Sequence, residues 1–425
     1  MTEIEVSNEI MNVKSREQMI RFLDGYSADR LEDLDERKNR APLVKSYMLE
    51  HAGDSRNLST VSNIMSERGI LSTPIDDNLS KLQEPGKNLF MGFLETLTPR
   101  YFVFYSIHES QLIDRWIRKL VASTSALDHV WLSGVTFNVL WNKVVQLNRP
   151  NRYARIMFQH DSIYQIDKEM ESPDEPEEDD ENTIINMGDE DDNHEILERR
   201  ASKFTLVDKI SVVHEKLKCL QDIYFPLYAI SQLRFPSPVG RGGHDFYDYG
   251  KVTNRSGDFR DHRNHILYIQ HIYDSLMKKT EEKIWFSIEK ETVKTLGEFQ
   301  NVIGSPLTIK FKEPLNKETF DYWIASTFGR TRNRFRLWGN PIRLGSKKVH
   351  VYGVDRHLWQ PIFMEFTDKH LMAIIPKGTC GNTVHRLVTN IQRFIDPAAD
   401  VYVGDMKYND MIGESSAKVK YESSN

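Results

Sequence analysis

Apolar residues recur at helical spacing through the first hundred positions of the chain. Three segments show this period, residues 16–23, 42–50 and 58–67, and Gly, Pro and Ser separate them. Residues 1–98 are therefore predicted to form a helical N-terminal region.

The period changes at Tyr101, where short runs rich in aromatic and β-branched residues begin. Such runs are typical of strands, and amphipathic segments between them predict helices. Residues 99–168 are predicted as a first α/β unit, with strands at 101–105, 130–132 and 153–158 and helices at 109–121 and 136–146.

Residues 201–305 are predicted as a helical connection. Its helices are expected at about 203–220, 261–279 and 282–299. Residues 236–260 are rich in Gly, Pro, Asp and Asn, a composition that favours an ordered loop.

Strands and helices return in residues 306–405, the second predicted α/β unit. The pattern predicts a strand at 308–312, a helix at 317–326, four strands between 335 and 375, and a closing helix at 383–395. Residues 406–425 are predicted as a loose C-terminal tail. The fold class is therefore α+β.

The two units align without a gap at a constant offset of 207 residues. Identities fall at Phe104/Phe311, Asp114/Asp321, Trp116/Trp323, Ile117/Ile324, Trp131/Trp338, Met157/Met364 and Asp161/Asp368. This pattern predicts an internal duplication, with chance alignment of two strand–helix–strand units as the alternative. The order strand, helix, four strands, helix, taken twice, resembles the saddle of the TATA-binding protein family. That resemblance implies a saddle-like pseudo-dimer. Because the chain has none of that family's sequence motifs, the resemblance assigns neither functional residues nor a function to this chain.

The charge is distributed unevenly along the chain. The net charge is −6, but residues 169–198 contain 15 acidic residues and neither Lys nor Arg. Without these 15, the remaining 47 acidic residues face 56 basic residues, which leaves a net charge of +9. Residues 169–200 are predicted to be a disordered acidic insert, and the basic remainder suits a polyanionic partner or serves solubility alone.

The chain carries no sign of secretion or of membrane insertion. Its first residues are acidic, without the apolar core of a signal peptide, and no apolar run approaches 18 residues. Only Cys219 and Cys380 occur, so a disulfide framework is not expected. These features predict a cytoplasmic protein that does not contact a membrane.

The first candidate site is a basic segment in the second α/β unit. Arg330, Arg332, Arg334 and Arg336 alternate, so an extended segment would project all four from one face. Arg343, Lys347 and Lys348 follow, and Trp338, Phe335 and Tyr352 are candidates for stacking. The segment predicts contacts to a nucleic-acid backbone; a charged edge strand guarded against aggregation is the alternative.

The second candidate site is the polar loop within 236–260 and the start of the helix after it. Arg241, His244, Lys251, Arg255 and Arg260 predict an anion-binding loop. The alternatives are a metal-dependent hydrolase with ligands or acid/base groups among His244, Asp245, Asp258, Asp261, His262 and His265, and an ordered connection held by Asp–Arg pairs. The spacing matches no established metal motif, and no cofactor is predicted.

The leading functional prediction is non-catalytic nucleic-acid binding through the basic segment, by a binding subunit or regulator that would suit a microbial defence system. The acidic insert is expected to compete for the basic face and so inhibit binding. The alternatives are a metal-dependent phosphodiesterase or nuclease centred on His244–His265, and a scaffold that contacts protein partners through the N-terminal region or the acidic insert.

Overall fold

The computed structural model shows a mixed α+β fold built around two antiparallel sheets. It describes residues 9–10, 12–35, 42–52, 58–84, 89–163, 202–224, 228–238, 240–293, 297–329 and 333–418. The acidic segment 169–200 lies outside these residues. Within them, no helix has the length and apolar character that crossing a membrane requires.

The larger sheet is built from the first two thirds of the chain. Its strand order is β2-β3-β4-β5-β1-β11-β10-β9-β7-β8, and β6 also pairs with β1. The strands are β1 (Lys45–His51), β2 (Leu71–Asp76), β3 (Leu79–Glu84), β4 (Leu89–Thr96), β5 (Tyr101–Ser106), β6 (Leu127–His129), β7 (Tyr153–His160), β8 (Ser202–Lys209), β9 (Ile230–Pro236), β10 (Gly243–Tyr247) and β11 (Lys251–Asn254).

Helices cover both faces of this sheet, so its central strands are buried on both sides. Residues of α3 (Leu58–Glu67) and α4 (Ser110–Ser123) share one core cluster with the sheet. Residues of α2 (Arg16–Asp35), α5 (Gly134–Leu147), α7 (Ile210–Tyr224) and α8 (Phe259–Ile284) share another. On β5, Val103 belongs to the second cluster and Phe104 to the first, as the two-residue period of a strand requires.

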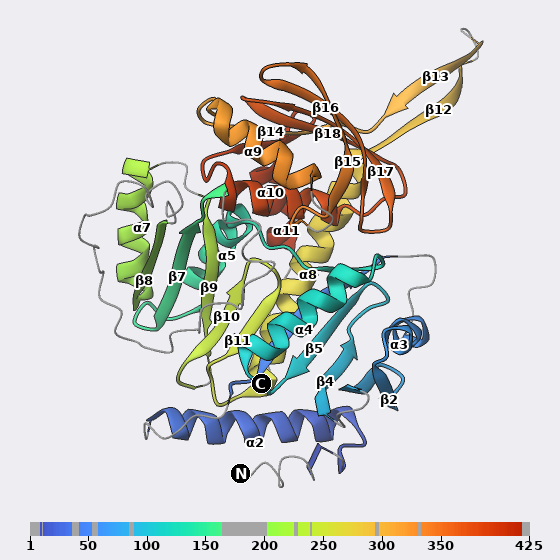
Figure 1. Cartoon of the computed structure of the whole chain (residues 1–425). Coiled ribbons are helices and arrows are strands. Elements are labelled where there is room, and N and C mark those ends of the chain that lie inside the picture. The colour runs from blue at the N-terminus through green and yellow to red at the C-terminus, as the bar shows by residue number, and fades with distance from the viewer. Residues whose placement is uncertain are drawn as a thin grey trace.

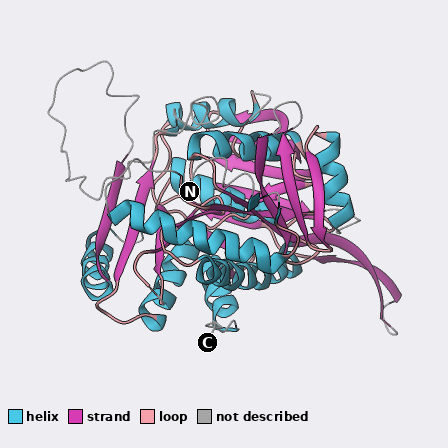
Figure 2. Cartoon of the chain, turned by 90° about the horizontal axis from the view of Figure 1, so that it is seen from below, coloured by secondary structure: helices cyan, strands magenta, loops and turns pink. Residues whose placement is uncertain are grey.

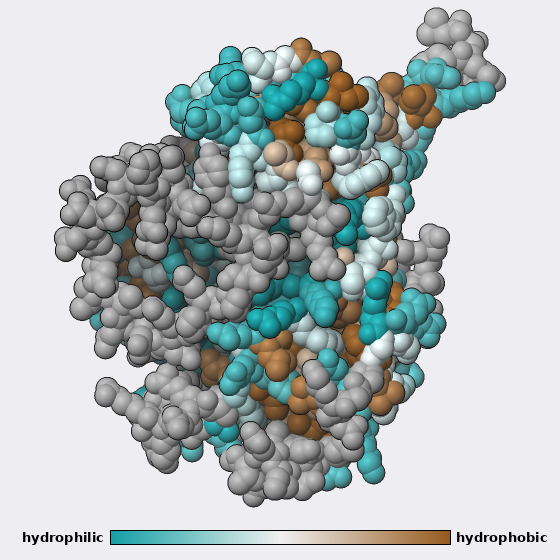
Figure 3. Space-filling view, viewed as in Figure 1, coloured by the Kyte–Doolittle hydropathy of each residue, from teal (hydrophilic) through white to brown (hydrophobic). Residues whose placement is uncertain are grey.

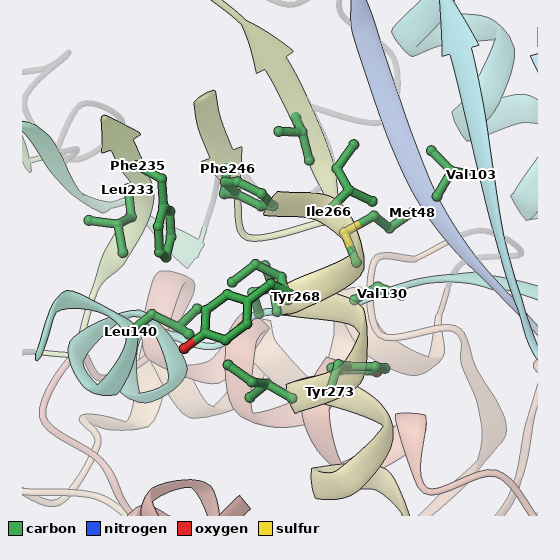
Figure 4. Packing of buried hydrophobic residues seen from close by; sticks show 14 of the residues in the cluster. Met48, Val103, Val130, Leu140, Leu233, Phe235, Phe246, Ile266, Tyr268 and Tyr273 are labelled. Atoms are coloured by element: carbon green, nitrogen blue, oxygen red, sulfur yellow. The ribbon is translucent and has the colours of Figure 1, made fainter. Parts of the chain in front are cut away.

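The long helix α8 lies across the larger sheet. Phe235 and Phe246 from neighbouring strands pack near Ile266 and Tyr268 of α8, with Leu140 of α5 beside them (Figure 4). Farther along, α8 contacts the smaller sheet, so one continuous helix connects the two parts (Figure 1).

The smaller sheet is built from the last third of the chain. Its order is β15-β16-β17-β18-β14-β19-β20. The strands are β14 (Leu307–Lys310), β15 (Leu337–Gly345), β16 (Lys348–Asp355), β17 (Gln360–Thr367), β18 (His370–Pro376), β19 (Asp400–Val403) and β20 (Met406–Lys407), and the helices are α9 (Lys317–Phe328), α10 (Asn382–Phe394) and α11 (Tyr408–Lys418). One face shares a core cluster with these helices.

A two-stranded hairpin projects from the body of the protein (Figure 1 and Figure 2). It consists of β12 (Trp285–Val293) and β13 (Gly297–Ile303), and its base joins β18 through a short parallel pairing. We call it the hairpin arm. Figure 3 shows apolar surface on this arm, where Ile288 and Val302 are exposed.

Several predicted elements differ in the structure. Residues 42–50 are not a helix but contain β1, whose residues are all buried; a strand buried on both faces lacks the alternation that marks a half-buried strand. The loop predicted at 236–260 contains β10 and β11, also buried. The single helix predicted at 203–220 is β8 followed by α7.

Two further predictions near the C-terminus also fail. Of the helix predicted at 282–299, residues 282–284 end α8, and the described residues from 285 onward belong to the hairpin arm, whose second strand begins at a glycine. The loose tail predicted at 406–425 contains β20 and α11, and Met411 and Ile412 of α11 lie in the core.

The internal duplication is not confirmed. At the offset of 207 residues, β5 matches β14 in position, α4 matches α9, and β7 matches β17. The elements between them differ, because α5 occupies the positions that correspond to the hairpin β15–β16.

Candidate functional site

In the described part of the predicted arginine row, the side chains of Arg334 and Arg336 point into the protein. Arg330 and Arg332 lie outside the described residues, and residues 333–336 form a turn instead of the predicted extended strand. The Nε atom of Arg334 donates to the side-chain oxygen of Asn390 at 2.6 Å. Arg334 therefore contributes to internal packing.

Arg336 belongs to a buried ion network between the two sheets. It donates to the carbonyl of Leu127 at 2.6 Å, and its guanidinium lies 3.3 Å from the carboxylate of Asp128. Arg386 of α10 is completely buried, forms an ion pair with Asp128, and donates to both oxygens of Asp355 at 2.6 Å. Since Asp128 lies on β6 and Asp355 ends β16, Arg386 links the two sheets.

This network shifts the pKa of Asp128. Burial alone would raise that pKa, but the guanidinium groups of Arg386 and Arg336 more than offset burial and hold it below its usual value. Asp128 is therefore charged at neutral pH, as its ion pairs require.

The other predicted basic residues of the second unit lie at the surface around the turn between β15 and β16. Their side chains are about half exposed, and each has an acidic partner: Arg343 with Asp321 at 2.5 Å, Lys347 with Asp368 at 2.7 Å and Lys348 with Glu365 at 2.7 Å. Exposed ion pairs contribute at most about 1 kcal/mol, so a phosphate group could replace these acids as a partner.

The five residues of the predicted anion-binding loop do not gather around one space. Lys251 is buried and donates to Asp114 at 2.8 Å. The remaining four are distributed as follows: Arg255 pairs with buried Asp245, Arg260 pairs with Glu17, Arg241 is exposed, and His244 is buried.

His244 instead meets residues at the start of α8. Its Nε2 lies 2.9 Å from Oδ2 of Asp261, and its Nδ1 lies 3.2 Å from Nδ1 of His262. Nε2 of His262 lies 2.8 Å from the hydroxyl of Ser46 on β1, and Nδ1 of His265 lies 3.3 Å from Oδ1 of Asp261. We call His244, Asp261, His262 and His265 the histidine cluster; all four are at most 5% exposed.

Local sequence explains how the histidine cluster assembles. Asp258 is the N-cap of α8 and accepts from the backbone N–H of Asp261, which fixes the first turn. Asp261 and His265 are four residues apart, so they share one helix face. That face lies against the buried strand β10, which carries His244.

Burial governs the titration of this cluster. It lowers the pKa of His244 to about 4, with the neighbouring His265 as the next cause. It also lowers the pKa of His262 well below the usual histidine value. Burial would raise the pKa of Asp261, but the hydrogen bonds from His244 and His265 offset this and lower it. His244 and His262 are therefore neutral at pH 7.

The four-stranded part of the smaller sheet, β15–β18, has a face that carries exposed aromatic residues. Trp338 on β15, Tyr352 on β16 and Phe363 on β17 are 57%, 65% and 40% exposed. Tyr352 and Phe363 are directly opposite each other, with ring centroids 5.6 Å apart. Trp338 is diagonal to Tyr352, since it pairs with Val354 two residues further on. We call this surface the aromatic face.

The turn between β16 and β17 carries another exposed aromatic residue, Trp359. Leu358 and Trp359 both have positive φ, 67° and 53°, a conformation that is uncommon for residues other than glycine. Leu358 packs against the core of the larger sheet, whereas Trp359 is 59% exposed beside Arg356. The strained turn therefore keeps one side chain inside and an aromatic ring outside, at the end of the sheet where β17 begins.

The opposite end of the aromatic face is polar. Glu365 lies between Lys348, His350 and His370, at 2.7, 2.8 and 3.2 Å. The hydrogen bond from Lys348, followed by those from the two histidines, lowers the pKa of Glu365 to about 2. Lys347, in the turn before β16, lies at this same end. Arg343 is an odd number of residues from Trp338 and forms an ion pair with Asp321 of α9, so its side chain lies on the opposite, helix-covered face.

Together, these observations define an α+β protein with an uncovered aromatic sheet face and a closed histidine cluster. The chain belongs to the family of MJECL33-like proteins, whose family model matches residues 7–410. It is similar to a protein of Methanocaldococcus jannaschii described as "Uncharacterized protein MJECL33". The two are 22% identical over 426 residues, which cover 93% of this chain and 96% of the relative. No solved structure matches the chain.

Sequence reasoning missed part of the aromatic face. It identified Trp338 and Tyr352 but not Phe363, and it did not identify the exposed Trp359 at the end of the sheet. The signal for Phe363 was available: Ile362, Phe363 and Met364 are consecutive apolar residues, so one of them must lie on the face opposite the core. Nothing in the sequence indicated the positive φ that exposes Trp359.

Proposed function

We propose that this protein binds single-stranded nucleic acid on the aromatic face. Bases would stack on Trp338, Tyr352 and Phe363, and Lys348 and Lys347 would contact phosphates at the polar end. The observation that carries the proposal is the set of three large aromatic side chains exposed on adjacent strands of one sheet face.

The shape of this surface favours a single strand over a duplex. A sheet face is flat and offers rings to bases that are already unstacked, whereas the bases of a duplex are stacked on one another and inaccessible. Aromatic stacking accepts every base, so the proposal implies little sequence preference.

The charges at the polar end set the expected salt dependence. Two lysines that exchange acidic partners for phosphates would release about two counterions. The slope of log K against log salt concentration would then be about −1.4, using about −0.7 per phosphate for a single strand. Binding would therefore depend more on stacking than on charge.

Fluorescence anisotropy with labelled oligonucleotides tests this proposal. We expect the full chain to bind single-stranded DNA or RNA more tightly than duplexes of the same sequence. Trp338→Ala combined with Tyr352→Ala should weaken binding at least tenfold, because stacking contributes about 1–3 kcal/mol per base. Tyr153→Ala is the matched control, since Tyr153 is equally exposed, at 61%, but lies on β7 of the other sheet.

Two results would overturn the proposal. One is the absence of binding to any oligonucleotide at low salt by a protein whose fold is intact by circular dichroism. The other is an equal loss of binding in Tyr153→Ala, which would show that the oligonucleotide contacts exposed rings without preference for the aromatic face.

A further inference from the structure

The histidine cluster has the composition and spacing of a metal site. His244, Asp261 and His265 each offer one ligand atom, and these atoms all lie within 4.8 Å of one another. Around a tetrahedral Zn²⁺ ion with bonds of about 2.0–2.1 Å, neighbouring ligand atoms are about 3.3 Å apart. His244 Nε2 lies 2.9 Å from Asp261 Oδ2, and His265 Nδ1 lies 3.3 Å from the other carboxylate oxygen, Oδ1, so the two histidines flank the same carboxylate.

The surroundings of the cluster resemble those of coordinated histidines in general. A metal-bound imidazole is held by a hydrogen bond at its other ring nitrogen. Nδ1 of His244 has such a partner in His262, and His262 is held in turn by Ser46. Phe235 and Phe259 lie against His265 and His262, so aromatic rings border the cluster.

We propose that His244, Asp261 and His265 bind a divalent transition-metal ion of the Zn²⁺ class. Imidazole nitrogens and a carboxylate are ligands that suit this class of ion, and a buried carboxylate is stabilised by coordination. The role is structural: the ion fastens β10 to the first turns of α8. The site is at most 5% exposed, so a substrate cannot reach it. This inference does not depend on nucleic-acid binding.

Metal binding fixes the direction of the hydrogen bonds within the cluster. With Nε2 of His244 on the ion, its Nδ1 carries the proton and donates to Nδ1 of His262. Nε2 of His262 then donates to the hydroxyl of Ser46. Without the ion, Nε2 of His244 donates to Asp261, and the chain runs in the opposite direction, from Ser46 through His262 to His244. The tautomer of His262 therefore reports occupancy, since its proton moves from Nδ1 to Nε2.

The test uses the full chain without a histidine tag. The protein is stripped with a chelator, reloaded with Zn²⁺, desalted and analysed by mass spectrometry for metal. We expect about one Zn²⁺ per chain, because the cluster offers one set of ligand atoms. His265→Gln should lose at least four fifths of it, whereas His271→Gln, an exposed histidine on the same helix, should retain it.

A second readout keeps the test decisive if His265→Gln fails to fold. Reloading the wild-type chain with Co²⁺ should give visible absorption bands typical of tetrahedral nitrogen and oxygen ligands, and Zn²⁺ should remove them. Less than a tenth of an equivalent of Zn²⁺ in folded wild-type protein would overturn the proposal. So would equal metal content in His265→Gln and His271→Gln.

Discussion

Replacing Arg386 with methionine tests whether the buried ion network holds the two sheets together. Methionine has a similar length and no charge, so the change removes the cation and keeps much of the apolar volume. It leaves the carboxylates of Asp128 and Asp355 facing each other across the junction, and it leaves the carbonyl of Phe335 without its 2.9 Å bond from Arg386.

The expected loss follows from the burial of the groups left behind. Breaking a buried ion pair by removing one partner costs about 3–5 kcal/mol, because an uncompensated charge remains. Arg386 serves two carboxylates, one fully buried and one 4% exposed. Arg336 stays 3.3 Å from Asp128 and compensates that charge in part. We therefore expect a decrease of about 4 kcal/mol in the free energy of unfolding.

Urea denaturation followed by circular dichroism measures this loss. Arg343→Met is the matched control, because Arg343 makes a single ion pair with an exposed aspartate, and its loss should cost less than about 1 kcal/mol. The loss for Arg386→Met should also shrink as pH falls, since protonation neutralises the stranded carboxylates. A loss for Arg386→Met no larger than that for Arg343→Met would refute the reasoning.

Three further predictions concern pH, packing and the acidic insert. Burial lowers the pKa of His357 to about 4 and that of His385 to about 3, so the unfolded chain takes up these protons below about pH 6.5 while the folded chain does not. The free energy of unfolding should therefore fall by up to about 3 kcal/mol per histidine between pH 6.5 and 4, and a flat urea-denaturation profile between pH 7 and 5 would contradict this. Gly134→Ala should lower the melting temperature sharply, because its Cβ would lie 1.4 Å from a backbone oxygen, whereas Gly345→Ala, with open space around it, should not. Deleting residues 169–198 should raise affinity for single-stranded oligonucleotides at low salt if the insert competes for the cations, and an unchanged affinity would exclude that competition.

The elements that could be predicted from sequence are those with one buried face. β16, β17 and β18 alternate between buried and more exposed residues, and the period of two made them recognisable. β1, β10 and β11 could not be recognised in this way, because both of their faces are covered and polar residues such as Lys45, Asp245 and Lys251 are buried in ion pairs or hydrogen bonds. When two polar residues far apart in the sequence are buried against each other, the sequence pattern wrongly indicates that both are exposed.

The candidate sites show the same limit. The importance of the region from His244 to His265 was evident from its density of polar residues, and its members at positions 244, 261, 262 and 265 do meet. The sequence placed the arginine row on an open strand face, whereas Arg334 and Arg336, the described part of that row, point inward. Arg336 is satisfied by residues more than 200 positions earlier in the chain, which no local pattern could indicate.

The histidine cluster and the Arg386 network should act independently, although α8 connects their neighbourhoods. His265 lies near the start of α8, and Tyr273, farther along, donates to the side-chain oxygen of Asn382 in α10 at 2.6 Å. Eight residues of helix separate His265 from Tyr273, a distance of about 12 Å. Sites this far apart without shared partners usually add within about 0.5 kcal/mol. The double variant His265→Gln/Arg386→Met should therefore lose the sum of the two single losses. A smaller loss would mean that the first change already loosens the junction, and that α8 transmits strain from one sheet to the other.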